Sequence, residues 1–258
     1  MQGLEASLTK AVRAAGDAAL AMSRAGFRRW LKPDGTPVTQ ADLTADAILR
    51  EHLGEALPDA GWQSEESAAA PPAQGRYWLA DPIDGTASFA RGDSGWCVAV
   101  ALIENHRPVL AAIYAPAMDM LWLAGAGRGA FRNGAPILAS TRERLEGARL
   151  IANSSTLAPE RWARPFPPVE RASLHAMQLR LCFVGEARQD ATIAIGPKQD
   201  WDLAAGDLIV SEAGGRVSDL QGQPLRYGIA GMARSGLVAA GAGLHAEIIA
   251  LTAPAREI

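Results

Sequence analysis

Residues 81–86 (DPIDGT) carry side chains suited to both metal and phosphate chemistry. They follow an apolar run at 77–80 that predicts a short buried strand, so both aspartates are expected to leave the strand end in a tight turn. Magnesium ions prefer several oxygen ligands, which two carboxylates and one backbone carbonyl of such a turn can supply. Gly85 would let the backbone approach a ligand closely, and a helix starting there would direct N–H groups toward an anion. The alternative is an ordinary turn capped by an aspartate.

Two further acidic segments lie far from this hexapeptide in the sequence. Glu65 and Glu66 stand just before a loop, and Asp202 follows Trp201 where a helix is expected to begin. Taken alone, the first pair is most simply a solvated surface cluster, and Asp202 a first-turn carboxylate that compensates the helix dipole. Considered together with residues 81–86, they favour one shared metal site.

The order of these motifs resembles the inositol monophosphatase family over nearly the whole chain. The resemblance rests on residues 32–42 (KPDGTPVTQAD), 65–67 (EES), 81–86, 201–202 (WD) and 212–215 (EAGG). It implies a layered α/β (α+β) fold in which helices alternate with mostly antiparallel sheets. It also implies two subdomains: residues 1–145, with most of the metal ligands, and residues 146–258, which would contribute Asp202 and the substrate pocket.

The resemblance further implies a magnesium-dependent phosphatase that binds two or three ions. The carboxylates of Glu65 and Asp81 and the carbonyl of Ile83 would hold one ion. Asp81, Asp84 and Asp202 would hold a second, and Glu65 would help to hold a third. Metal ions in such a site lower the pKa of water, neutralise phosphoryl oxygens and stabilise the leaving alkoxide, so no covalent nucleophile is required.

Asp42 and Thr86 would jointly orient and deprotonate the water that attacks phosphorus, and with Glu65 they form the expected catalytic set. Asp42 also has a structural explanation. It stands three residues after Thr39, the spacing of a reciprocal helix cap that is worth about 0.5–2 kcal/mol. The two roles are compatible.

The sequence departs from the inositol-type pattern in the substrate pocket. Where those enzymes carry a small Gly-Ser/Thr-Ala run, this chain has residues 175–177 (HAM), and where they carry an acidic residue it has Ile195. The pocket is therefore expected to be narrower or differently polar. The expected substrate contacts are Asp84, Gly85, Thr86, His175, Met177, Lys198 and Asp202.

Gly196 and Pro197, shortly before Trp201, resemble the bacterial branch that includes 3′(2′),5′-bisphosphate nucleotidases. Lys198 would then bind a second phosphate, the alternative being a solvated loop lysine. This favours adenosine 3′,5′-bisphosphate as the substrate, with inositol 1-phosphate and histidinol phosphate as alternatives. A sugar bisphosphatase would need an arginine-lined second pocket, for which the candidates are Arg180 and Arg188.

A different class of protein would keep the metal ligands, lack turnover and act by interaction. The presence of Thr86 together with every expected ligand argues against it. The resemblance also implies a homodimer and inhibition by lithium.

Composition argues against several other classes. The net charge is -3 over 258 residues, whereas proteins that bind nucleic-acid polymers usually present a basic face. Charged residues interrupt the apolar side chains of the first 26 residues, which predicts an amphipathic helix rather than a signal peptide or membrane span. Cys97 and Cys182 lie in apolar stretches and are expected to be buried thiols of a cytoplasmic protein. The histidines lack the spacing of a zinc site, and most are expected at the surface.

Apolar periodicity predicts the elements that position these residues. It predicts a helix up to about Gly26 and a second helix from Thr39 that is closed by Pro58. Runs divided by Gly, Pro and Asn predict an antiparallel meander over 96–137. The remaining predictions are a loop at 67–75, a turn at 125–129 (GAGRG) without dinucleotide-site spacing, strands at 148–155, 190–195 and near 237, and helices at 174–187, from about 201 to Gly214 and from about 243.

Overall fold

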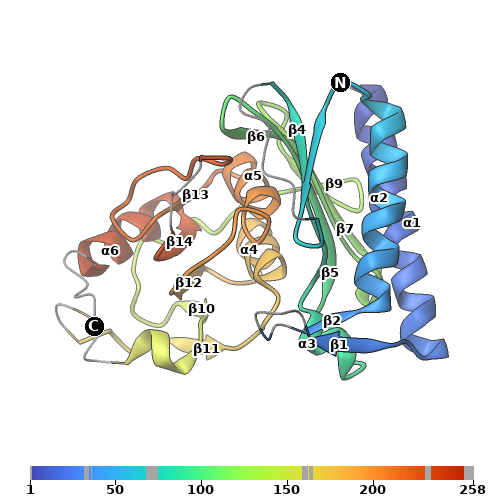
Figure 1. Cartoon of the computed structure of the whole chain (residues 1–258). Coiled ribbons are helices and arrows are strands. Elements are labelled where there is room, and N and C mark those ends of the chain that lie inside the picture. The colour runs from blue at the N-terminus through green and yellow to red at the C-terminus, as the bar shows by residue number, and fades with distance from the viewer. Residues whose placement is uncertain are drawn as a thin grey trace.

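The computed structural model describes residues 2–31, 35, 37–67, 75–158, 162, 165–229 and 234–252. Helices and sheets alternate in layers (Figure 1), which confirms the predicted fold class. The helical layers are α1 (Gln2–Ala25) with α2 (Gln40–Ala56), then α4 (Met177–Gly185) with α5 (Ala204–Glu212), and finally α6 (Ala242–Thr252).

A seven-stranded sheet separates α1 and α2 from α4 and α5. Its strands lie in sequence order, and every neighbouring pair is antiparallel except β3 and β4. The antiparallel meander predicted for residues 96–137 is therefore confirmed. The strands are β3 (Gly61–Ser64), β4 (Tyr77–Asp84), β5 (Cys97–Glu104), β6 (Arg107–Ala115), β7 (Met120–Gly125), β8 (Ala130–Arg132) and β9 (Ala135–Ile137).

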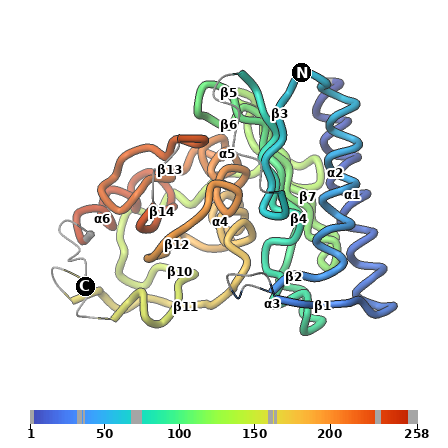
Figure 2. The backbone as a smooth tube through the Cα atoms, viewed as in Figure 1, coloured from blue at the N-terminus to red at the C-terminus, as the bar shows by residue number. Residues whose placement is uncertain are grey.

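A five-stranded sheet with the order β11-β10-β12-β14-β13 lies between α4 and α5 on one side and α6 on the other. Figure 2 traces it in yellow to red, across α4 and α5 from the cyan and green strands of the first sheet. The pairs of β10 with β11 and β12 are parallel, and β14 is antiparallel to both neighbours. The strands are β10 (Arg149–Ile151), β11 (Glu170–Ala172), β12 (Ala191–Ile195), β13 (Gly215–Ser218) and β14 (Gly236–Gly241).

The boundary between the two large sheets falls after β9. The first sheet uses only residues before 145 and the second only residues after 146, but the division into two subdomains at that point stays a prediction. The smaller elements are a hairpin of β1 (Arg29–Leu31) and β2 (Pro37–Thr39), the short helix α3 (Thr86–Ala90), and 3-10 turns at Pro116–Met118 and Ser154–Leu157.

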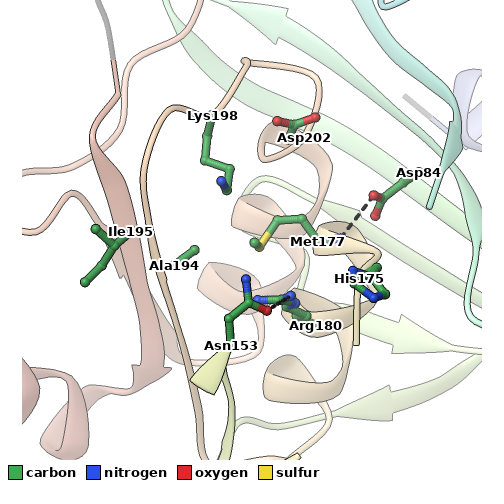
Figure 3. Close-up of a pocket in the computed structure, with 9 residues that line it drawn as sticks. All are labelled: Asp84, Asn153, His175, Met177, Arg180, Ala194, Ile195, Lys198 and Asp202. Atoms are coloured by element: carbon green, nitrogen blue, oxygen red, sulfur yellow. Dashed lines mark hydrogen bonds between the residues drawn. The ribbon is translucent and has the colours of Figure 1, made fainter. Parts of the chain in front are cut away.

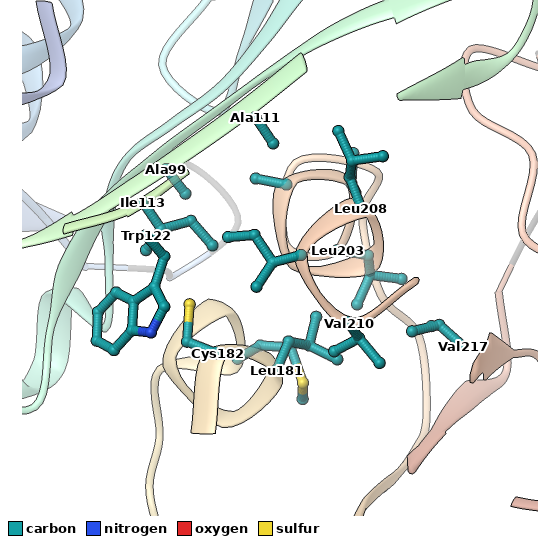
Figure 4. Packing of buried hydrophobic residues seen from close by; sticks show 14 of the residues in the cluster. Ala99, Ala111, Ile113, Trp122, Leu181, Cys182, Leu203, Leu208, Val210 and Val217 are labelled. Carbon is teal, nitrogen blue, oxygen red and sulfur yellow. The ribbon is translucent and has the colours of Figure 1, made fainter. Parts of the chain in front are cut away.

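The strands of the first sheet are apolar on both faces because both faces are covered by helices. In β5, Val98 and Val100 pack in the cluster formed with α1 and α2. Ala99 alternates with them and packs in the cluster that includes Leu181 of α4 and Leu208 of α5. Figure 4 shows this second cluster, in which the sheet contributes the small residues Ala99 and Ala111 as well as the larger Trp122. Small residues on the sheet let α4 and α5 approach it closely.

The predicted helix boundaries are partly correct. The reciprocal cap of α2 is confirmed, because Thr39 and Asp42 each accept from the other's backbone N–H, and Gly214 (φ +83°) follows the end of α5. The predicted helix from about 201 instead begins at Ala204. The strand predicted over 148–155 ends at Ile151, because the N–H of Thr156 in the following 3-10 turn donates to a local carbonyl rather than to a neighbouring strand.

Other predictions concern single residues. Cys97 and Cys182 are buried free thiols, as predicted. His245 is an exception among the histidines, since it is 6% exposed and lies 2.8 Å from the Ser218 hydroxyl.

Most of the loop predicted at 67–75, and most of the first half of the motif at 32–42, lie outside the described residues. Among the helices that the structure describes, none is long and apolar enough to cross a membrane.

The turn between β7 and β8 binds a carboxylate. The backbone N–H groups of Gly127, Arg128 and Gly129 all donate to the carboxylate of Glu212, at 2.9, 3.0 and 2.9 Å. A negative charge at the C-terminal end of α5 is unfavourable to the helix dipole, and these donors compensate it. The predicted strand-connecting turn is thus confirmed, and it also anchors the end of α5.

Replacing Glu212 by glutamine should lower the free energy of unfolding by about 1–3 kcal/mol, because one side-chain oxygen becomes a donor that faces backbone donors. Urea denaturation measures this change. Glu51→Gln, at an exposed position of α2, serves as the matched control and should change little. Equal effects of the two substitutions would show that the turn does not anchor α5.

Candidate active site

Asp81 and Asp84 lie inside β4, not in a turn after it as the sequence suggested. Asp81 pairs with Ala99 of β5 and Asp84 pairs with Cys97, and the register shifts between them. Pro82 cannot donate to the sheet ladder, so the pairing is interrupted there and the strand forms a bulge. This bulge, rather than the predicted turn, brings the two carboxylates into one region.

The carboxylate of Asp84 lies at the N-terminus of α4. It accepts the backbone N–H groups of Met177 and Gln178 at 3.0 and 2.5 Å, and the thiol of Cys97 lies 3.9 Å away. A helix N-terminus stabilises a negative charge. Asp84 therefore joins the first sheet to α4 through charge-assisted hydrogen bonds.

Gln178 extends this connection to the segment that carries Asp202. Its side chain accepts the N–H of Gly206 at 2.8 Å and donates to the carbonyl of Trp201 at 2.7 Å. Asp202 lies in the turn before α5 and accepts the N–H of Gln199 at 2.9 Å. It is therefore not a first-turn helix residue, and its carboxylate is held by its own turn.

Glu65 follows β3, and its N–H donates to the carbonyl of Ala80 at 3.2 Å, which places it beside Asp81. The preceding residue, Ser64, is buried, donates to the Asp46 carboxylate of α2 and accepts the N–H of Glu66 at 3.2 Å. The segment that carries Glu65 is thus fixed by both the sheet and α2.

Asp42 uses its two oxygens for different partners. Oδ2 accepts the N–H and hydroxyl of Thr39 at 2.8 and 2.6 Å. Oδ1 lies 3.1 Å from the Thr86 hydroxyl, which also lies 3.0 Å from the carbonyl of Ile83. Capping and contact with Thr86 therefore coexist, and burial raises the pKa of Asp42 despite these hydrogen bonds.

The backbone at Gly85, between Asp84 and Thr86, requires glycine. Its φ of +93° is in the left-handed region, and a Cβ there would lie 2.8 Å from the carbonyl oxygen of Gly95. Any other residue would push the start of α3 away from the neighbouring loop. This glycine lets Thr86 follow Asp84 directly and still reach Asp42.

The carboxylates repel one another electrostatically. Burial, followed by the charges of Glu65, Asp84, Asp202 and Asp42, raises the pKa of Asp81 well above its usual value. Burial, followed by the charge of Asp202, raises the pKa of Asp84 to about 7, and burial raises that of Asp202. A bound cation would relieve this repulsion.

Several features fit a magnesium site. Oδ1 of Asp81 is buried and has no hydrogen-bond partner in the described part of the chain, and the neighbouring carboxylates supply the oxygen donors that magnesium prefers. Among the described residues, no group of three histidine, cysteine, aspartate or glutamate side chains is already arranged to hold an ion. Small side-chain movements toward an ion are therefore needed, as expected for carboxylates that repel one another.

A cavity of about 260 Å³ adjoins these carboxylates (Figure 3). It is lined by Asp84, Asn153, His175, Met177, Arg180, Ala194, Ile195, Lys198 and Asp202. Of the expected substrate contacts, only Gly85 and Thr86 are missing from this lining, and Ile195 is part of it. Arg188 lies outside it: it is exposed, and its guanidinium stacks on the Phe183 ring at 4.3 Å.

Sequence reasoning missed two residues of this region. Gln178 was detectable as a polar residue within the apolar stretch that forms α4. Asn153 gave no signal, because its contact with the Arg180 guanidinium at 3.0 Å depends on how β10 and α4 pack. The catalytic, metal-binding and substrate-binding roles of the individual residues stay predictions.

The fold and the site together define the class of protein: a layered α/β protein with buried carboxylates beside a cavity of small-molecule size. Comparisons with known proteins identify the same class. The model of the inositol monophosphatase family matches residues 2–257. Histidinol-phosphatase of Mycobacterium tuberculosis is 36% identical over 232 residues, which cover 84% of this chain and 85% of that protein. The 3′(2′),5′-bisphosphate nucleotidase CysQ of Escherichia coli is 31% identical over 205 residues, which cover 76% and 81%.

Solved structures show the same fold. The structure of IMPase from Thermotoga maritima superposes with a TM-score of 0.83 and 26% identity, covering 97% of this chain and 96% of that one. The chain belongs to the inositol monophosphatase family, a family of phosphatases that are generally metal-dependent. The family predicted from the sequence motifs is confirmed.

The metal-free chain should lose stability as the pH rises. The Asp84 carboxyl has a usual pKa of 3.8, and in the folded chain burial and Asp202 raise it to about 7. The folded state therefore holds more protons than the unfolded state between these values, and the free energy of unfolding falls as the pH rises through that window. Thermal unfolding in a chelator at about pH 5 and about pH 8 measures this fall. Magnesium at one hundred times its Kd should restore about 2.7 kcal/mol per site at the higher pH.

Asp81→Asn is the control for this prediction. The amide can donate to neighbouring carboxylates, so the variant should be more stable than the parent chain at about pH 8 without metal, and magnesium should stabilise it less. If the variant is less stable than the parent without metal, the argument from carboxylate repulsion is wrong.

Proposed function

We propose that this protein is a magnesium-dependent phosphomonoesterase that hydrolyses a small phosphorylated metabolite by direct attack of water. The observation that carries the proposal is the convergence of acidic side chains on Asp81, whose buried Oδ1 has no partner in the described part of the chain. Glu65, Asp81 and the carbonyl of Ile83 would hold one ion, and Asp81, Asp84 and Asp202 a second. A third ion would be held in part by Glu65.

Bound magnesium would lower the pKa of water, neutralise phosphoryl charge and stabilise the leaving alkoxide. The chain itself supplies a proton path. The Thr86 hydroxyl can accept a hydrogen bond from water while donating its own proton toward Oδ1 of Asp42, 3.1 Å away. Thr39 fixes Oδ2 of the same carboxylate, so Oδ1 keeps a constant direction toward Thr86.

The substrate would lie in the cavity lined by His175, Met177 and Lys198, with its scissile phosphate near Asp84, Gly85, Thr86 and Asp202. The apolar side chains of Met177 and Ile195 offer no partner for the hydroxyls of a polyol. Together with Lys198, they support a preference for a 3′(2′),5′-bisphosphate nucleotide such as adenosine 3′,5′-bisphosphate. The alternatives are inositol 1-phosphate and histidinol phosphate. We also propose that the protein is a homodimer, lies in the cytoplasm and is inhibited by lithium.

A phosphate-release assay with three substrates tests the proposal. Phosphate release is measured with and without magnesium from adenosine 3′,5′-bisphosphate, inositol 1-phosphate and histidinol phosphate. The expected result is magnesium-dependent release, fastest from the bisphosphate, that disappears in Asp81→Asn. No release from any compound would favour the alternative class, an inactive metal-binding protein.

Thr86 gives a second, independent prediction. Thr86→Ala removes the hydroxyl between water and Asp42 and should lower kcat by about 10²–10⁴, whereas Thr86→Ser keeps the hydroxyl and most of the activity. Stability should change little, because the Thr39 cap of α2 is untouched. Steady-state kinetics and thermal unfolding of both variants make the comparison, and a serine variant as slow as the alanine variant would contradict the proton path.

A further inference from the structure

Asp200 forms a largely buried ion pair beside the turn that carries Asp202. Its Oδ1 accepts hydrogen bonds from Nε and Nη2 of Arg234 at 2.8 and 2.7 Å, and its Oδ2 accepts the backbone N–H of Gly228 at 2.6 Å. The side chains of Arg234 and Asp200 are 5% and 20% exposed. Both carboxylate oxygens of Asp200 are therefore engaged within the chain, and the lining of the cavity includes Asp202 but not Asp200.

The backbone of Asp200 is bonded across Asp202. The carbonyl of Asp200 accepts the N–H groups of Leu203 and Ala204 at 3.2 and 3.1 Å. The Asp202 carboxylate accepts the N–H of Gln199, the residue before Asp200, at 2.9 Å. A displacement of Asp200 would therefore move the Asp202 carboxylate with it.

Gly228, one partner of Asp200, is fixed to the first sheet. The preceding residue, Tyr227, donates its N–H to the carbonyl of His106 in the turn between β5 and β6 at 3.1 Å, and its carbonyl lies 2.8 Å from Nδ1 of His106. Gly228 has a φ of +71°, and a Cβ there would collide with the hydroxyl of Tyr77 in β4. Glycine therefore lets the chain pass close to the sheet and still donate to Asp200.

Arg234, the other partner, is held by the same loop. Its guanidinium lies over the Tyr227 ring, 4.8 Å from the ring centroid, and donates to the carbonyl of Arg226. The Tyr227 hydroxyl donates in turn to the buried carboxylate of Asp207 in α5 at 2.9 Å. The backbone carbonyl of Arg234 accepts the N–H of Lys198 at 3.3 Å. Arg234 thus joins this loop to the segment that leads to Asp202.

The turn that carries Asp202 is consequently tied to the first sheet by two routes. One runs through Gln178 and the N-terminus of α4 to Asp84. The other runs through Asp200 and Gly228 to the turn between β5 and β6. Asp84 and Asp202 come from different elements (Figure 3), so a shared ion requires their separation to be fixed by the rest of the chain.

We propose that Asp200 and Arg234 form a positioning pair that keeps the Asp202 carboxylate at the separation from Asp84 that a shared magnesium ion requires. The proposal rests on the proposed function, since that function assigns Asp202 to an ion. The pair touches neither ion nor substrate and acts through Asp202. Groups that orient metal ligands in this way typically change metal affinity by about 10–100-fold.

Calorimetric titration of magnesium into the substrate-free chain separates positioning from charge. Arg234→Met removes a positive charge near the turn, so electrostatics alone predicts tighter binding of the cation. Positioning predicts the opposite, and we expect the ion shared by Asp84 and Asp202 to bind about tenfold or more weakly. Arg234→Lys, which keeps the charge but not the guanidinium geometry, should lie between the two. Binding by Arg234→Met as tight as in the parent chain, or tighter, would overturn the proposal.

A second comparison does not depend on the folding of Arg234→Met. Asp200→Asn keeps the size of the side chain and should weaken magnesium binding by about tenfold or more. Because Asp200 acts through Asp202, the same substitution should have no further effect in an Asp202→Asn background. An equal loss in both backgrounds, or no loss in the parent chain, would contradict the positioning role.

Asp190→Asn is the matched control. Asp190 forms a second Arg–Asp pair with Arg149 at 2.9 Å and precedes β12, at the opposite end of that strand from Ile195, which lines the cavity. The control should lower the thermal unfolding temperature and leave magnesium affinity as in the parent chain. A loss of affinity equal to that of Asp200→Asn would reduce the effect to general destabilisation and reject the positioning pair.

Phosphate release keeps this inference separate from the proposed function. Asp200→Asn should raise the magnesium concentration needed for half-maximal release, while kcat at saturating magnesium stays close to that of the parent chain. Weakened magnesium binding in this variant, with no release from any substrate by the parent chain, would reject the phosphatase mechanism and keep the positioning pair. Release by the variant with the magnesium dependence of the parent chain would do the reverse.

Discussion

The structure depends on keeping several carboxylates buried close to one another at the end of β4. Like charges in a low-dielectric interior repel strongly, and burial adds to the cost of ionising them. The raised pKa values of Asp81 and Asp84 reflect both effects. A chain selected only for stability would not retain this arrangement, so the cluster supports the proposal that a bound cation stabilises the site.

The surrounding layers compensate part of this cost and fix the site. The N-terminus of α4 donates two N–H groups to Asp84, and Gln178 of the same helix binds both sides of the turn that carries Asp202. The first turn of α2 holds Asp42 through its cap at Thr39. Asp42, Asp84 and Asp202 are thus each held at or beside a helix end, where backbone donors are available. The layered fold brings these helix ends together in one place.

The sequence predicted features that arise from local chemistry. Apolar runs gave the meander from β5 to β9, Thr39 and Asp42 gave the cap of α2, and Gly214 marked the end of α5, since each depends on neighbours within a few residues. The bulge at Pro82 was missed because a tight turn and a bulged strand have the same residue signature. The pairing of Gln178 with both sides of the turn that carries Asp202 depends on tertiary packing and leaves no local pattern. The position of Arg180 beside Asn153 and the cavity could not be predicted for the same reason.

The charge of the cavity is a better guide to the proposed substrate than overall similarity is. A histidinol-phosphatase and a bisphosphate nucleotidase are 36% and 31% identical to this chain over much of its length, so overall identity does not decide between their substrates. Substrate choice depends instead on the few side chains that face the remainder of the molecule. A buried cation there rejects a substrate that cannot pair with it far more strongly than a change in apolar contact area would. Arg180 and Lys198 make one side of the cavity positive, which is the charge that the proposed bisphosphate substrate needs.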